Sequence, residues 1–155
     1  MNCREVVLRK EGVWKGNYER CGAEAGIPAL SRIFAMLSRD EARHAEALRA
    51  MQDGAAVELA HSTTAERAKT LLRRLSMQDA PLSNFNGELS CYAIAMDYEA
   101  ANARLCGQLA REALHGWERE LLLKIAAEDE MHFTLLEHMR ELLLPAFCAE
   151  VCDAG

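Results

Sequence analysis

The feature that most constrains this chain is a repeat of potential metal ligands. Two stretches that lie 88 residues apart each begin with a glutamate, followed by a second acid 30 residues later and by a histidine 33 residues later. The residues are Glu11, Glu41 and His44 in the first stretch, and Glu99, Asp129 and His132 in the second. A repeat of this kind predicts two similar structural units, each supplying half of one site.

Apolar residues repeat with the same shift along the chain. They are Leu8, Ile33, Phe34, Leu37, Leu48 and Met51 in the first stretch, and Met96, Leu121, Leu122, Ile125, Leu136 and Met139 in the second. Within each long segment the apolar positions are three and four residues apart, which is typical of the buried face of a helix. The repeat therefore predicts a duplicated helical hairpin.

Turn and capping residues divide the chain into elements. Gly26 suits the turn of the first hairpin, and Pro145 is expected to end the last helix. Thr63 and Glu66 form a capping-box pattern that predicts a short helix in the connection between the hairpins. A stretch rich in Pro, Ser, Asn and Gly over residues 81–87 is predicted to be a loop. The long helices are predicted at residues 3–23, 28–51, 88–113 and 117–144.

The spacing predicts that the acids of each hairpin meet. Glu11 and Glu41 are each 15 residues from Gly26, so at about 1.5 Å per residue both lie about 22 Å from the turn. Glu99 and Asp129 are at the same distance from the second turn, near Leu114. Residues three apart share a face of a helix, which brings each histidine beside the acid that precedes it.

Four carboxylates and two imidazoles in a helical core require a partner. Burying ionised acids without one costs several kcal/mol each, so they must be protonated, paired or bound to cations. Carboxylate oxygens together with imidazole nitrogens suit iron or manganese. Bundles that hold two such ions take a Glu from each of two helices and a Glu-x-x-His motif from each of the other two. The pattern predicts a site for two iron ions, with manganese as the alternative.

Two segments resemble the motifs of a known family. Residues 33–48 read IFAMLSRDEARHAEAL, and Glu11 lies seven residues before Tyr18. These stretches are similar to the second-helix and first-helix motifs of the rubrerythrin branch of the ferritin-like superfamily, and the third and fourth helices match by position. The resemblance covers about residues 5–143. The resemblance implies an all-α fold, a ferritin-like four-helix bundle with a long crossover between the second and third long helices.

The resemblance also implies a role for each ligand. By this resemblance, Glu41 and Asp129 would bridge the two irons, and Glu11 and Glu99 would be outer ligands. His44 and His132 would each bind one iron. Because Asp stands where the family has Glu, Glu128, one turn before His132, is the alternative to Asp129. Tyr18 and Cys106 are equivalent in the repeat and are interpreted as core residues, with a role beside the ligands or as redox groups as the alternative.

The implied activity is that of a non-haem di-iron oxidoreductase that reduces peroxide or dioxygen, with no catalytic residue beyond the metal ligands. The alternatives are an iron-binding or ferroxidase role and a metal-free interaction bundle. No rubredoxin module with C-x-x-C pairs is present, so electrons would come from a separate donor such as a rubredoxin or a reductase. Because a long connection lets hairpins exchange between chains, we expect a homodimer, in which the hairpins could be domain-swapped.

Composition excludes several classes of protein. A length of 155 residues, half of them apolar, suits a single domain over residues 1–155. The net charge of -6 leaves no basic footprint for nucleic acid or for an anionic membrane surface. No stretch approaches the roughly 18 apolar residues of a membrane span, and the N-terminus lacks the apolar core of a signal peptide. We therefore expect a cytoplasmic protein.

Overall fold

The structure is a computed structural model that describes residues 2–76 and 89–154, with side chains up to residue 144. Within these ranges the chain forms helices and no strand, so the all-α prediction is confirmed. None of the described helices is long and apolar enough to cross a membrane. The helices are α1 (Cys3–Glu24), α2 (Pro28–Gln52), α3 (Thr64–Ser76), α4 (Ser90–Glu112) and α5 (Gly116–Ala154).

The helix boundaries follow local signals in the sequence. Asn2 caps α1 by accepting a hydrogen bond from the Glu5 backbone, while the Glu5 side chain accepts one from the Asn2 backbone. Gly26 has a φ of 72°, in the left-handed region that favours glycine, and Pro28 fills the first position of α2. The predicted starts and ends of α1 and α2 and the start of α3 are thus confirmed to within about a residue.

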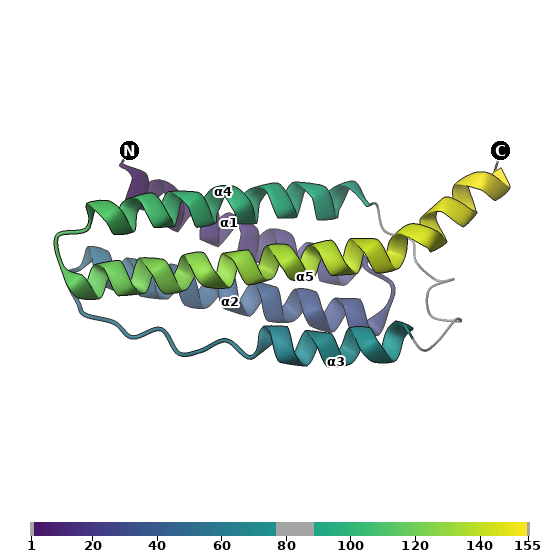
Figure 1. The fold of residues 1–155 in the computed structure, drawn as a ribbon, viewed down its shortest axis with the longest axis horizontal. Helices are drawn as coiled ribbons and strands as arrows, with labels where there is room; N and C mark the ends of the chain where they lie inside the picture. The colour runs from purple at the N-terminus through teal and green to yellow at the C-terminus, as the bar shows by residue number, and fades with distance from the viewer. Residues whose placement is uncertain (1, 77–88, 155) are drawn as a thin grey trace.

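The four long helices pair as two hairpins and lie side by side in a helical bundle (Figure 1). The most extensive helix contacts are those between α1 and α2 and between α4 and α5. The turns of the two hairpins lie at opposite ends of the bundle (Figure 1). Residues 53–76 run back along the bundle, and α3 packs against α2 and α5. Sites halfway along both hairpins consequently fall at the same level.

The prediction that Pro145 ends the last helix is wrong, because α5 continues to Ala154. A proline inside a helix has no N–H to donate to the carbonyl four residues earlier, here that of Glu141, and such positions kink a helix rather than always ending it. The last turns of α5 accordingly bend away from the bundle (Figure 1). The loop predicted at 81–87 lies outside the described residues.

Two apolar clusters lie on either side of a buried polar layer. One contains Tyr18, Leu30 and Leu136 together with α3 residues such as Ala68, and the other contains apolar residues such as Leu48, Cys106 and Ile125. Every apolar residue predicted for the buried stripes of α2 and α5 is buried: Leu30, Ile33, Phe34, Leu37, Leu48, Met51, Leu121, Leu122, Ile125, Leu135, Leu136, Met139 and Leu143. The polar layer between the clusters is therefore shielded along the bundle axis.

Candidate metal centre

The six predicted ligands all lie in this polar layer, and each is 0% exposed. One comes from α1, two from α2, one from α4 and two from α5: Glu11, Glu41, His44, Glu99, Asp129 and His132. Because acids on four different helices cannot be buried together without compensation, this layer must hold protons or cations.

The ligand atoms form two overlapping groups. Glu11 and His44 join Glu41 and Asp129 in one group, and Glu99 and His132 join the same two acids in the other; within each group the atoms lie within 4.8 Å of one another. Each group has the residue types and the size to hold one ion. Glu41 and Asp129 belong to both groups and could therefore supply a ligand to either ion.

The two histidines are placed in equivalent ways. His44 Nδ1 lies 3.5 Å from both Glu11 Oε2 and Asp129 Oδ1. His132 Nδ1 lies 3.1 Å from Glu99 Oε1 and 3.3 Å from Glu41 Oε1. Each imidazole therefore faces one acid of its own hairpin and one acid of the other, so the repeat in the sequence becomes a repeat in the geometry.

The other ring nitrogen of each histidine faces an acid outside the two groups. His132 Nε2 lies 2.9 Å from Asp40 Oδ2, and His44 Nε2 lies 3.4 Å from Glu128 Oε1. Glu128 also pairs with Arg43 at 3.0 Å, so of the two alternative acids on α5 it is Asp129 that lies among the other ligands. The role of Asp40 was not predicted, although Asp40 and Glu128 are 88 residues apart and belong to the same repeat.

Asp40 is held by the segment that connects the hairpins. Ser62 and Thr64 each donate a hydrogen bond from their hydroxyls to Asp40 Oδ2, at 2.9 and 2.7 Å, and Arg43 pairs with Oδ1 at 2.8 Å. Burial acts to raise the pKa of Asp40, but its contact with His132 and these hydroxyls lower it to about 2. Asp40 is therefore an ionised acceptor that can fix the orientation of the His132 ring.

Two tyrosines and an asparagine donate hydrogen bonds to the carboxylates. Tyr18 donates its hydroxyl to Glu99 Oε1 at 2.6 Å, and Tyr98 donates to Glu41 Oε2 at 2.9 Å. Asn102 donates through Nδ2 to Glu11 Oε1 and to Asp129 Oδ2, both at 2.8 Å.

These bonds revise the sequence interpretation. The interpretation of Tyr18 as a core residue alone is incomplete, because its hydroxyl also contacts the predicted ligand Glu99. Cys106 is buried in the apolar cluster that contains Leu48 and Ile125. Tyr98 and Asn102 were missed; the only signal for Asn102 is its position three residues after Glu99, on the same face of α4.

The acids of the layer hold protons unequally. Burial, followed by the charge or hydrogen bonding of neighbouring acids, raises the pKa of Glu11 well above its ordinary value, and burial raises that of Glu99 despite the opposing charge of His132. Burial and the charge of Glu41 raise the pKa of Asp129 to about 7. Burial also acts to raise the pKa of Glu41, but its interactions with Glu11 and His132 lower it to about 2. Glu41 is thus the most readily ionised acid of the layer, whereas burial favours the protonated form of Glu11, Glu99 and Asp129.

The histidines respond in the opposite sense. Burial acts to lower the pKa of both rings, but contact with Glu128 raises that of His44, and the charge of Glu99 raises that of His132 well above its ordinary value. The layer therefore stabilises positive charge at its centre, which is the condition for binding cations.

Several buried atoms of the layer have no hydrogen-bond partner among the residues that the structure describes. They include Glu11 Oε2, Glu41 Oε1, Glu99 Oε2, Asp129 Oδ1 and His44 Nδ1. All five are atoms that could ligate a metal, and a buried acceptor left without a partner costs roughly 1–3 kcal/mol. The set of oxygen and imidazole donors fits divalent iron or manganese. The residues present therefore fit a two-ion site.

The sequence matches no protein-family model, and comparisons with curated proteins and with solved structures return no match either.

Proposed function

We propose that this chain is a ferritin-like di-iron carboxylate protein of the rubrerythrin type. The observation that carries the proposal is that two four-residue groups of buried ligand atoms share Glu41 and Asp129. Two adjacent ions with shared acids account for the closeness of four carboxylates, because the ions would replace the protons that burial favours on Glu11, Glu99 and Asp129.

Each residue would take a definite part in holding the metals. Glu41 and Asp129 would bridge the ions, with Glu11 and His44 completing one site and Glu99 and His132 the other. Asp40 and Glu128 would orient the two imidazoles from behind, through the contacts at 2.9 and 3.4 Å.

The proposed activity is the two-electron reduction of peroxide or dioxygen, and two bound iron ions would supply its redox chemistry. Reduction of hydrogen peroxide to two waters consumes two electrons and two protons. The electrons would come from an external donor, such as a rubredoxin or a reductase. The protein's own contribution is to exclude water from the layer and to hold the carboxylates in place through the hydroxyls of Tyr18 and Tyr98 and the amide of Asn102.

Anaerobic metal analysis of the purified protein, followed by an optical spectrum after oxidation, tests the proposal. We expect about two iron ions per chain, lost in Glu41→Ala and retained in Glu130→Ala, because Glu130 is an exposed acid on the same helix as Asp129. Steady consumption of peroxide with an added electron donor separates a reductase from a protein that only binds or oxidises iron. A protein that binds no divalent metal, or loses it equally in both variants, would rule the proposal out.

A further inference from the structure

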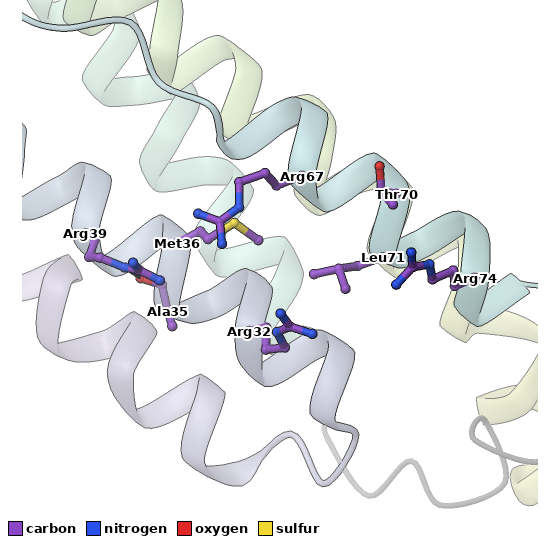
Figure 2. Close-up of a pocket in the computed structure, with 8 residues that line it drawn as sticks. All are labelled: Arg32, Ala35, Met36, Arg39, Arg67, Thr70, Leu71 and Arg74. Atoms are coloured by element: carbon purple, nitrogen blue, oxygen red, sulfur yellow. Dashed lines mark hydrogen bonds between the residues drawn. The ribbon is translucent and has the colours of Figure 1, made fainter.

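A groove of about 310 Å³ lies between α2 and α3 and is lined by none of the metal-layer residues (Figure 2). Four arginines line it, two from each helix: Arg32 and Arg39 from α2, and Arg67 and Arg74 from α3. We refer to them as the groove arginines. The side chains of Met36 and Leu71 also line the groove.

The groove arginines have no counter-charge of their own. All four are exposed, and no acid lines the groove. Ion pairs within the described ranges engage Arg4 and Arg43 but none of the groove arginines. The chain as a whole carries a net charge of -6, so this concentration of positive charge is opposite to the overall balance. Like charges gathered in one groove repel one another until an anion enters.

The spacing of the arginines places them along a line. On each helix the two residues are seven positions apart, which puts them on the same face and about 10 Å apart. Figure 2 shows Arg39 at one end of the groove and Arg74 at the other, with Arg67 and Arg32 between them. The charge is therefore spread along the groove rather than focused at one point.

We propose that this groove binds a small organic molecule that carries two phosphate groups. Guanidinium groups match phosphate oxygens in paired hydrogen bonds, and two phosphates bring about four negative charges at neutral pH, one for each groove arginine. Met36 and Leu71 offer apolar contact to the carbon skeleton between the phosphates. The volume is at the lower end of the range of ligand sites, which is about 300–1,000 Å³. The site uses none of the metal-layer residues and does not depend on the proposed iron chemistry.

Calorimetric titration of the full chain with fructose 1,6-bisphosphate and with inorganic phosphate tests this site. We expect the bisphosphate to bind more tightly than phosphate. Arg32→Gln and Arg67→Gln should each weaken bisphosphate binding about tenfold or more, because each removes a charged hydrogen-bond donor. Arg67→Lys should weaken it less than Arg67→Gln, because charge is retained while the paired geometry is lost.

Arg73→Gln is the matched control. Arg73 is an exposed arginine next to Arg74 on α3, but it does not line the groove, so its loss should leave binding unchanged. Equal weakening in all three glutamine variants would mean diffuse attraction and would overturn the proposal. Bisphosphate binding that none of the variants changes would place the ligand elsewhere, for example at the metal centre, and would also overturn it. The proposal is also overturned if neither small anion binds and only an acidic polymer such as polyglutamate does, because the groove would then suit a protein partner.

Discussion

Neighbouring acids on α5 face different partners in the metal layer. Asp129 is fully buried and lies among the predicted ligands, whereas Glu128 reaches the outer nitrogen of His44 and pairs with Arg43. We predict that Asp129→Asn removes metal, whereas Asp129→Glu keeps both ions, because it retains the carboxylate on the same face of the helix. Glu128→Gln should keep both ions with an affinity about 10–100-fold lower, because Glu128 acts only through His44.

Metal counts on the three purified variants check this assignment. If Glu128 were the ligand instead, Glu128→Gln would be the variant without metal and Asp129→Asn would keep two ions. Full occupancy in both amide variants would show that α5 does not contribute an acid to the site.

Tyr98 provides a second test on single residues. Its hydroxyl donates to Glu41, and its ring stacks on Trp14 with centroids 4.6 Å apart. Tyr98→Phe keeps the stacking but leaves a buried carboxylate oxygen without its donor, which should destabilise the metal-free protein by about 1–3 kcal/mol in urea unfolding. Tyr92→Phe is the control, because Tyr92 is equally buried and no described residue hydrogen-bonds its hydroxyl. Equal losses in the two variants would contradict the role given to Tyr98.

The repeat in the sequence predicts only some residues of the metal layer. The repeat pointed to all six clustered residues, and it also contained Asp40 and Glu128. It could not reveal Tyr98 or Asn102, because the equivalent positions in the first hairpin are Lys10 and Trp14. Hydrogen bonds between helices depend on side-chain directions that spacing along one helix does not determine.

Among the elements, the start of α3 is linked to the metal layer. Thr64, its first residue, donates to Asp40 at 2.7 Å, and Asp40 contacts His132. We predict that Thr64→Val lowers the free energy of unfolding by about 1–3 kcal/mol and weakens metal binding about tenfold, because Asp40 loses a donor and orients His132 less well.

Thr70→Val is the control for this prediction. Thr70 lies on the same helix and donates only to the carbonyl of Glu66 one turn earlier. Calorimetric unfolding and a metal titration measure both effects. If both threonine variants bind metal like the natural chain, α3 and the preceding segment only cover the bundle and do not support the site.

Helix existence was predictable from apolar periodicity, since the stripes of α2 and α5 are buried as expected. The end of α5 was not predictable, because a proline gives the same local signal whether it kinks a helix or ends it. The residues that follow Pro145 include Ala and Glu, which favour helix and allow it to continue.

Considered as a whole, the molecule divides its site between two hairpins. Each ligand group takes residues from both hairpins, and contacts are most extensive within each hairpin. We predict a homodimer in which hairpins can exchange. Mixing Glu11→Ala chains with Glu99→Ala chains should then slowly restore one complete ligand set per exchanged dimer, measured as regained iron. A monomer at micromolar concentration by light scattering would refute this.

Proton linkage in the polar layer affects the stability of the whole molecule. Asp129 has an ordinary pKa of 3.8 and one of about 7 in the fold, and the pKa values of Glu11 and Glu99 are also raised. The folded, metal-free protein thus binds more protons than the unfolded chain between about pH 4 and 7, so its stability falls as the pH rises through this window. At about 1.4 kcal/mol per pKa unit, the raised pKa of Asp129 alone accounts for a loss of stability on the order of 4 kcal/mol across this window.

Metal should reverse this dependence, because each ion displaces protons and binds more tightly as the pH rises. The lowered pKa values of Asp40 and Glu41, both about 2 against ordinary values of 3.8 and 4.5, act in the opposite sense, but below about pH 5. We predict that the chelator-treated protein melts at a lower temperature at pH 7.5 than at pH 5, whereas the stabilisation by added Fe(II) under anaerobic conditions is larger at pH 7.5. Scanning calorimetry at both pH values measures the two trends. A metal-free protein that gains stability between pH 5 and 7.5 would show that the buried acids are not stabilised by protonation. The cause of their close approach would then lie outside the metal layer.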